Sequence, residues 1–560
     1  MDFVHRMVLS DFILLWDILY EESRGDSRGR LVIEKGQPMR AIISVANREG
    51  LVELAQQLQN RGVTIFSTSG TLNALKTAGI HVEAVSTLTH FPEILGGRVK
   101  TVHTAILGGI LARRDMPGHM EELQAHNITP IDIVVVNLYP FAETVARPTT
   151  TLTEAQEQID IGGVTLIRAA AKNFQDVIVL VRPQDYVPVM QEWSELGEVS
   201  IETRRRLAAI AFQHTACYDT AIAEYLRIPA LDYFPEELTF PLKRIQTLRY
   251  GENPHQRAAL YRWADTAPSS PAPSVAGAEV LHGKELSFNN LLDLDVALAA
   301  VSSFTAPAVV IIKHTNPCGL ACGDTLVDAY KKAHAGDPIS AYGGIIGCNR
   351  RIDAAAAQEI TQLFYEAIIA PGFSPEALEI LRGKKNLRLL ATHYPIEPRA
   401  VNTQVLNAGR PEVRSVSGGL LLQTPDTVGE QETEYSVVTE REPTLEEVTD
   451  LMFAWKVVRH VKSNAIVLAH KLAVVGVGAG QMNRAASVQL AVDKAAERAR
   501  GSVLASDAYF PFADGVEIAA KAGVTAIIQP GGSIRDEEAI RMANRYAVAM
   551  VFTGKRHFRH

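Results

Sequence analysis

Short apolar runs alternate with amphipathic segments along most of this chain. β-branched runs predict strands, and segments with apolar residues spaced by three or four positions predict helices. In the first half, the predicted strands are at 41–45, 63–66, 131–138 and 177–181, and the predicted helices are at 51–59, 71–77 and 164–173. This alternation indicates an α/β fold with a doubly wound parallel sheet.

The second half alternates in the same way. Its predicted strands are at 308–312, 342–347, 465–469, 472–477, 524–528 and 547–552, and its predicted helices are at 325–335, 353–370, 445–460, 483–499, 515–522 and 535–545. A polar, acidic stretch at 424–443 separates two similar α/β lobes, at about 245–420 and 440–560.

A proline-containing segment with little periodicity, 228–248, separates the two halves, and a chain of 560 residues is long enough for several cores. We therefore predict one domain at 39–235 and a second at 236–560. Residues 1–38 include an apolar stretch too short for a membrane span, and they lack a small-residue cleavage site. We predict that 1–38 is an extension that is disordered or not native.

Composition narrows the classes of function. Apolar residues make up 47% of the chain and charged residues 21%, as in a soluble globular protein. The net charge of −8 provides no basic field, so we expect neither a nucleic-acid partner nor membrane attachment. The four cysteines are too sparse for a disulfide framework and indicate a cytoplasmic location. His314, Cys318 and Cys322 differ in spacing from zinc deaminases and lack a fourth ligand, so we predict no metal.

Lys313 and His314 follow the apolar run 308–312, and the chain then breaks at 315–319. Ligands bind beyond the carboxyl ends of strands in open α/β sheets. A histidine there can carry a proton near neutral pH, and a lysine supplies charge. An isolated Lys–His pair is more often an exposed strand end, so its interpretation depends on the motifs around it.

Two loops in the first half follow predicted strands and lead into helices. Ser44 and Arg48 belong to the first, and the second contains Ser67, Ser69, Gly70 and Thr71. Backbone N–H groups and hydroxyls at a helix N-terminus suit a phosphate group, although the same residues are ordinary helix caps.

Further along, two glycines precede Arg98, Lys100 and Thr101. Tyr139 ends the apolar run 131–138, Asp160 precedes a Gly-Gly pair, and Lys172 lies at the far end of the following helix. Each lysine alone would be read as surface. Together these groups could clamp a polar substrate and move protons.

The strings Gly-Gly-Arg-Val-Lys-Thr at 96–101, Asn-Leu-Tyr-Pro-Phe at 137–141 and Gln-Ile-Asp-Ile-Gly-Gly-Val-Thr-Leu at 158–166 resemble the inosinate cyclohydrolase half of the bifunctional purine biosynthesis family. The resemblance implies a methylglyoxal-synthase-like fold for this half. It implies catalytic roles for Lys100, Tyr139, Asp160 and Lys172. The nucleotide site would be lined by Ser44, Arg48, Ser67, Ser69, Gly70, Thr71, Arg98 and Thr101.

The first half departs from the family pattern at three places. Residues 46–48 are Ala-Asn-Arg instead of Ser-Asp-Lys, Ser69 replaces a glycine, and 103–107 has lost the Pro and second His of His-Pro-x-x-His. Arg48 keeps the cation with a planar fork. These changes motivate the alternative that the cyclohydrolase half is weakened or lost.

The second half opens on Arg249 and Tyr250, in a string that resembles the entry motif of the family's formyltransferase half. Lys313, His314 and Asn464 match its catalytic strand ends. The remaining matches, on the nucleotide loop, the folate side and the C-terminal tail, are Arg484, Tyr509, Phe512, Arg556 and Phe558. The Gly476-x-Gly478-x-Gly480 loop mimics a dinucleotide fingerprint, but no acidic residue is suitably placed, which argues against a nicotinamide site.

The resemblance covers essentially 40–560 and implies two cytidine-deaminase-like lobes in the second half. It implies formyl transfer from 10-formyltetrahydrofolate to 5-aminoimidazole-4-carboxamide ribonucleotide (AICAR), giving the formylated ribotide (FAICAR), which then closes to inosine monophosphate (IMP). It also implies a homodimer. A non-catalytic nucleotide sensor is the alternative from another class; it would need no base such as His314.

Overall fold

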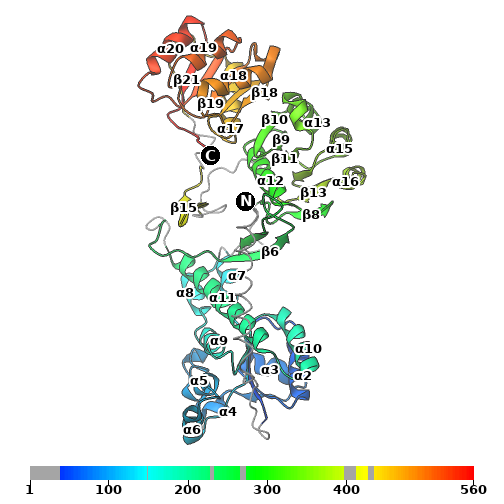
Figure 1. The fold of residues 1–560 in the computed structure, drawn as a ribbon, viewed down its shortest axis with the longest axis vertical. Helices are drawn as coiled ribbons and strands as arrows, with labels where there is room; N and C mark the ends of the chain where they lie inside the picture. Colours follow the sequence, from blue (N-terminus) through cyan, green and yellow to red (C-terminus); the bar gives the residue numbers. More distant parts are fainter. Residues whose placement is uncertain (1–37, 148, 228–232, 265–272, 397–410, 427–433) are drawn as a thin grey trace, which may run out of the picture. The chain divides into compact units, whose positions relative to one another are not determined.

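The computed structural model describes residues 38–147, 149–227, 233–264, 273–396, 411–426 and 434–560, so the predicted extension at 1–38 falls almost wholly outside them. The chain divides into two compact units. The first contains the described residues up to Leu242 together with a short return at Trp263. The second contains Lys243–Arg262 and the described residues from 273 onward; it runs from green to red in Figure 1.

The first unit is built on a five-stranded sheet of order β3-β2-β1-β4-β5 in which every pairing is parallel. The strands are β1 Arg40–Val45, β2 Thr64–Ser67, β3 Glu83–Ala84, β4 Ile133–Asn137 and β5 Ile178–Leu180. This confirms the predicted doubly wound parallel sheet. β4 lies between β1 and β5 and is buried throughout, because its β-branched run faces helices on both sides.

Helices enclose this sheet. They are α2 Leu51–Asn60, α3 Ser69–Thr77, α4 Ser86–Thr89, α5 Thr104–Leu111, α6 Pro117–Ala125, α7 Phe141–Val145, α8 Leu152–Glu157, α9 Gly162–Lys172, α10 Tyr186–Leu196 and α11 Ile201–Leu226. α9 buries an alanine-rich stripe against β4, β5 and α11, which allows the close packing that positions its N-terminus.

The second unit contains a mixed twelve-stranded sheet of order β16-β21-β20-β19-β17-β18-β10-β9-β11-β12-β13-β8. Its strands are β8 Glu279–His282, β9 Ala308–Lys313, β10 Asn316–Cys322, β11 Ile345–Cys348, β12 Ala367–Ala370, β13 Arg388–Ala391, β16 Ser436–Val437, β17 Ile466–His470, β18 Ala473–Gly478, β19 Val503–Ser506, β20 Ala526–Gln529 and β21 Ala549–Phe552. Two smaller hairpins pair β6 Leu242–Leu248 with β7 Ala258–Trp263 and β14 Glu412–Val416 with β15 Gly419–Gln423.

The helices of this unit divide into two groups that repeat one order of elements. The first group is α12 Phe288–Val301, α13 Leu326–Gly336, α14 Pro338–Ala341, α15 Ala354–Ile360 and α16 Pro375–Arg382, and the second is α17 Leu445–Val458, α18 Arg484–Ala495, α19 Asp514–Lys521 and α20 Asp536–Arg545. In each lobe, one helix (α12 or α17) precedes a hairpin, and helices alternate with strands after it (Figure 1). The β10–β18 pair joins the lobes into one sheet.

Two local predictions were wrong. The helix predicted at 353–370 is α15 followed by β12, because Ala367–Ala370 is a short buried strand whose alanines disguise its β-branched centre. The break predicted at 315–319 is the start of β10, which accommodates Pro317 through a register shift between Pro317 and Gly319. β9 therefore lies between two antiparallel neighbours, β10 and β11.

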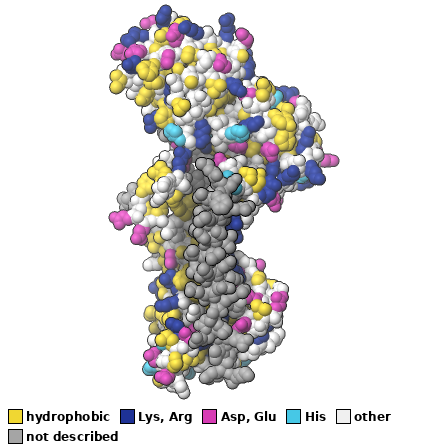
Figure 2. Space-filling view, in the orientation of Figure 1, with side chains coloured by type: hydrophobic (Ala, Val, Ile, Leu, Met, Phe, Trp, Pro, Cys, Tyr) yellow, Lys and Arg dark blue, Asp and Glu magenta, His cyan; other side chains and the backbone are white. Residues whose placement is uncertain are grey.

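No helix among the described residues is long and apolar enough to cross a membrane. On the face of the second unit visible in Figure 2, basic and acidic side chains are interspersed.

Candidate active sites

Two loops of the first unit meet beyond the carboxyl ends of β1 and β2. The Ser44 and Thr68 hydroxyls are 2.9 Å apart, and Thr71 Oγ1 accepts a hydrogen bond from the Val45 N–H at 3.0 Å. Arg48 donates to the Gly70 carbonyl at 3.2 Å. The predicted phosphate loops are thus held side by side, with the guanidinium of Arg48 over the second.

α3 begins at Ser69, earlier than predicted, so Ser69, Gly70 and Thr71 form its first turn. The N–H groups of a first turn lack partners within the helix and point at whatever lies beyond its end. The Glu93 carboxylate lies beside this turn, because Ser69 Oγ donates to both of its oxygens at 2.8 Å. Ser67 is instead buried, and its hydroxyl donates to the Ile43 carbonyl at 2.6 Å.

Asn137, at the end of β4, organises the first loop and was not among the predicted site residues. Its Oδ1 accepts from the N–H groups of Ala46 and Asn47 at 2.7 and 2.8 Å, and its Nδ2 donates to the Asn47 carbonyl at 3.0 Å. In the sequence, the only sign of this role is that Asn137 is polar and ends an otherwise apolar run at 133–136.

Lys100, Tyr139 and Asp160 lie together. The Lys100 ammonium is 6.0 Å from the centre of the Tyr139 ring. Burial raises the pKa of Asp160 above its ordinary value, opposed by the hydrogen bond from the Gly163 N–H, which is 2.7 Å long, and by the charge of Lys100. Tyr218 holds the backbone here, accepting from the Asp160 N–H at 2.8 Å; burial raises its pKa to about 12.

The Gly-Gly pair after Asp160 is required by space. A Cβ on Gly162 would lie 2.5 Å from Thr101 Oγ1, and one on Gly163 would lie 2.6 Å from Asp160 Oδ2. Thr101 is 3% exposed, and its hydroxyl has no hydrogen-bond partner among the described residues. Its place beneath Gly162 ties the 96–101 loop to the start of α9.

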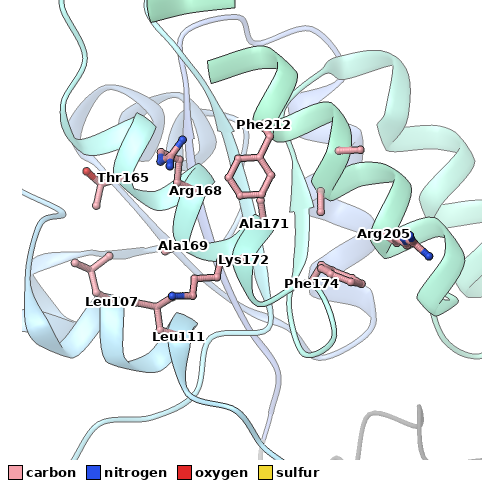
Figure 3. Close-up of a pocket in the computed structure, with 12 residues that line it drawn as sticks. Leu107, Leu111, Thr165, Arg168, Ala169, Ala171, Lys172, Phe174, Arg205 and Phe212 are labelled. Carbon is pink, nitrogen blue, oxygen red and sulfur yellow. The ribbon is translucent and has the colours of Figure 1, made fainter. Parts of the chain in front are cut away.

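The structure does not bring Lys172 to this cluster. Asp160 and Lys172 stand at opposite ends of α9, and its 11 residues at about 1.5 Å each separate them by roughly 16 Å. Lys172 lines a cavity of about 630 Å³ between α5, α9 and α11, where it extends toward Leu111 on α5 (Figure 3). Arg98 is exposed and paired with Glu157.

In the second unit, strand directions bring the predicted catalytic residues to one edge of the sheet. β9 ends at this edge and β10 starts there; β18 ends there, and β17 starts there. Lys313, His314 and Asn464 therefore lie at the same edge. A hydrogen bond from the Lys462 N–H to Asn316 Oδ1, 3.0 Å long, connects the two lobes at this point.

His314 lies in the two-residue turn between β9 and β10. His314 and Thr315 have φ values of 54° and 60°, both positive as a type I′ turn requires. Asp293 on α12 holds the turn by accepting from the Thr315 N–H at 2.6 Å. Burial raises the pKa of Asp293, opposed by its hydrogen bonds from the turn and by the charge of His314. The imidazole itself is exposed.

Lys313 and His314 have different neighbours although they are adjacent in sequence. The Lys313 ammonium donates to the Tyr342 carbonyl at 2.8 Å, before β11, whereas the turn containing His314 is held by Asp293. The strand end therefore brings both residues to the same edge of the sheet, where their surroundings differ.

Asn464 is held by Arg484, which is not a free guanidinium. Arg484 Nη2 donates to Asn464 Oδ1 at 2.7 Å, and its Nη1 contacts Asp507 and Ser506. The side chains of Arg484 and Asp507 are 5% and 0% exposed. Asp507 follows β19 and was not among the predicted site residues, although it lies two residues before Tyr509, which was.

The C-terminal tail runs along the same edge. The His557 N–H donates to the Asp507 carbonyl at 3.0 Å, and the Ser463 N–H donates to the Arg559 carbonyl at 2.9 Å. The guanidinium of Arg556 is 4.4 Å from the centre of the Phe558 ring, and Phe558 is partly exposed.

The other predicted binding residues flank this edge. Tyr509 and Phe512 are exposed just after β19, with Arg535 stacked 4.8 Å from the centre of the Phe512 ring. Arg249 stacks on Tyr250, and the loop that follows them is tied to α12, since Asn289 Nδ2 donates to the Glu252 carbonyl at 3.3 Å.

The thiols considered for a metal lie apart. Cys318 and Cys322 pack into different core clusters. Alternate residues of β9 divide between the same two clusters, so the clusters, and with them the two thiols, lie on opposite faces of the sheet. Burial raises the pKa of both thiols to about 12. Within the described ranges, no group of three or more His, Cys, Asp or Glu side chains could hold a metal ion.

Comparison with known proteins shows the family of the chain. The family model "AICARFT/IMPCHase bienzyme" matches residues 170–494, and the model "MGS-like domain" matches 50–165. The "Bifunctional purine biosynthesis protein PurH" of Anoxybacillus flavithermus is 54% identical over 521 residues, which is 93% of this chain and 99% of that protein. Proteins of the same name from Halalkalibacterium halodurans and Bacillus cereus are each 52% identical over the same shares.

A solved structure titled "Crystal structure of ForH" is 34% identical and covers 34% of this chain and all of its own; its TM-score of 0.32 is too low to inform the fold. The family model and the full-length relatives instead decide the assignment. The chain belongs to the AICARFT/IMPCHase bienzyme family and is a bifunctional enzyme of purine biosynthesis with AICAR formyltransferase and IMP cyclohydrolase activities.

Proposed function

We propose that the second unit transfers the formyl group of 10-formyltetrahydrofolate to AICAR, with His314 as the base. The aromatic amine of AICAR is a weak nucleophile, so it must lose a proton as it attacks the formyl carbon. The exposed imidazole at the sheet edge accepts that proton. The bond between the formyl carbon and folate N10 then breaks, and N10 takes up a proton.

The negative charge that develops on the formyl oxygen needs a positioned donor. Asn464 and Lys313 lie at the same edge and supply an amide N–H and an ammonium. Tyr509 and Phe512 offer exposed rings for flat heterocycles, and Arg249, Tyr250, Arg556 and Phe558 border the region for the ribotide. The observation that carries the proposal is the convergence of His314, Lys313 and Asn464 on one edge.

We propose that the first unit closes FAICAR to IMP. The carboxamide nitrogen attacks the formyl carbon, and water leaves. Asp160, whose pKa is raised by burial, exchanges protons, while Lys100 and Tyr139 steady the charge on the formyl oxygen. The ribotide phosphate binds at the first turn of α3, beside Ser44 and Arg48. The catalytic role that the family resemblance gives Lys172 stays a prediction.

The formyl donor, a cytoplasmic location and a homodimer are parts of the same proposal. The domain limits 39–235 and 236–560 are assigned to cyclohydrolase and formyltransferase respectively. The substrates are small nucleotides and a folate, with no nucleic-acid partner and no metal.

Two assays on the full chain test these roles separately. Formyl transfer from 10-formyltetrahydrofolate to AICAR is followed for wild type and His314→Ala, and cyclisation of supplied FAICAR is followed for wild type and Lys100→Ala. We expect His314→Ala to lose transfer by about 100-fold or more and to keep cyclisation. Unchanged transfer in His314→Ala refutes the base, and wild-type protein that cannot cyclise FAICAR supports the alternative of a lost cyclohydrolase.

A further inference from the structure

We propose that Arg484 and Asp507 are positioning residues that fix the amide of Asn464 so that it presents an N–H to the reacting formyl oxygen. The proposal rests on the role of Asn464 given above. It differs from the nucleotide-binding role that the family resemblance implies for Arg484, in which the guanidinium would neutralise the ribotide phosphate.

The bonds of the Asn464 amide determine which of its groups remains available. A guanidinium can only donate, so the oxygen of Asn464 must face Arg484, and the 2.7 Å bond fixes that orientation. Asn464 Nδ2 donates one hydrogen to the Gln481 carbonyl at 2.8 Å. Among the described residues these are the bonds of the Asn464 side chain, which leaves its second Nδ2 hydrogen for a substrate.

The second terminal nitrogen of the Arg484 guanidinium, Nη1, is hydrogen-bonded as well. It is the first residue of α18, and its Nη1 bonds to Ser506 Oγ at 2.8 Å and to the carboxylate of Asp507. Both charged side chains are almost fully buried, so they stabilise one another and cannot easily turn away. A guanidinium in this position polarises the Asn464 amide, because donation to its oxygen strengthens its N–H as a donor.

Two further hydrogen bonds hold Asp507 in place. Ser463, the residue before Asn464, donates its hydroxyl to the Asp507 carboxylate. The Asp507 carbonyl accepts from the His557 N–H in the C-terminal tail. The backbone of Asn464 is also fixed, since Ser487 Oγ donates to its carbonyl at 2.8 Å. Residues of α18 therefore bond to Asn464 directly, and the C-terminal tail bonds to Asp507, which follows β19 and holds Arg484.

Steady-state formyl transfer by Arg484→Lys separates positioning from phosphate binding. The ammonium of lysine keeps the charge but cannot span Asn464 and Asp507 together. We expect kcat to fall by about 30-fold or more while KM for AICAR stays within about threefold. Ser506→Ala keeps the buried ion pair and removes one contact of the guanidinium, so it is the milder variant and should lower kcat by a few-fold with KM unchanged.

A rise of more than about tenfold in KM for AICAR, absent with the phosphate-free riboside, would place Arg484 on the phosphate and overturn the proposal. Unchanged kcat in both variants would also overturn it. Thermal unfolding and the cyclohydrolase activity of the same samples check that each variant is folded.

Asn464→Asp and Asn464→Ala make failures of the two proposals distinguishable. Asn464→Asp still accepts from Arg484 but cannot donate, so we expect it to lose transfer by about 100-fold, as Asn464→Ala does. Transfer retained in Asn464→Ala would refute the catalytic role proposed for Asn464. Transfer lost in Asn464→Ala but unaffected in Arg484→Lys would refute only the positioning.

Discussion

The turn that holds His314 has a counterpart in the second lobe, which gives a matched test of strain and function. Lys471 and Leu472 connect β17 to β18 with φ values of 52° and 57°, close to those of His314 and Thr315. Asp450 on α17 accepts from the Lys471 N–H at 2.8 Å, as Asp293 on α12 accepts from the first turn. The left-handed backbone at His314 therefore belongs to the hairpin, and the imidazole is placed on it.

Replacing His314 or Lys471 with glycine should stabilise the second unit slightly. A left-handed conformation costs an L-residue roughly 1–2 kcal/mol, and glycine removes that cost. Glycine also makes the unfolded chain more flexible, which takes back about 0.4–1 kcal/mol. The net gain is about 0–1.6 kcal/mol, or up to roughly 3 °C in Tm for a unit of this size.

The two variants should differ in activity. His314→Gly removes the proposed base and should lower formyl transfer by about 100-fold or more. Lys471→Gly should leave it unchanged, because antiparallel pairing puts this turn at the opposite edge of the sheet, roughly 20 Å away.

Thermal unfolding by circular dichroism and a coupled transfer assay on the same samples check both parts. Destabilisation by His314→Gly alone would mean that the imidazole makes stabilising contacts. Equal loss of activity in both variants would mean that the turns act through the fold and not through the base. Either result would refute the reasoning.

Three further predictions concern buried or competing charges. Glu93→Gln should lower KM for FAICAR a few-fold in cyclohydrolase kinetics, because the carboxylate that Ser69 now holds no longer repels the phosphate; an unchanged or higher KM would contradict this. Burial, and then nearby cations, lower the pKa of His460 well below 6.5, so below that pH the unfolded chain takes up a proton that the folded chain does not. Urea unfolding should therefore show the second unit losing stability as pH falls below about 6.5, and His460→Gln should reduce that loss. The pKa of Asp160 is raised in the folded chain, so ionisation of its carboxyl lowers the stability of the fold once the pH exceeds about 3.8, the pKa in the unfolded chain. Asp160→Asn should therefore stabilise the first unit at about pH 7 but not at about pH 3, while cyclisation is lost.

Hydrophobic periodicity predicted most elements of both sheets, because buried strands and amphipathic helices leave strong local patterns. It failed at 353–370, where Ala367–Ala370 is a strand only because it is covered on both faces. It also failed at Asn316–Cys322, where pairing with β9 overrides the local preference of Pro317 and Gly319. Both failures are cases in which tertiary contacts decide against local propensity.

The candidate sites were predicted less evenly, since the motifs identify which residues gather but not which atoms bond. Lys100, Tyr139 and Asp160 were predicted together and lie together, although only Tyr139 directly follows a strand; Lys100 lies in the loop after residues 95–97, and Asp160 lies just before α9. Lys172 was predicted at the far end of the helix that follows the Gly-Gly pair, so the helix length already separated it from Asp160, and it was the motifs and the family resemblance that grouped the two residues.

Arg484 shows why partners cannot be inferred from a motif. An arginine at the start of a helix after a glycine-rich loop is a reasonable phosphate ligand by sequence. Whether it is free depends on Asp507, which reaches it only because β19 runs antiparallel to β17. The guanidinium that the sequence suggests as a substrate ligand is therefore bonded to protein groups. In the proposal above it acts on the substrate only through the amide of Asn464. If Asn464 has the role proposed above, formyl transfer depends on a buried charge pair that does not itself contact the reacting atoms.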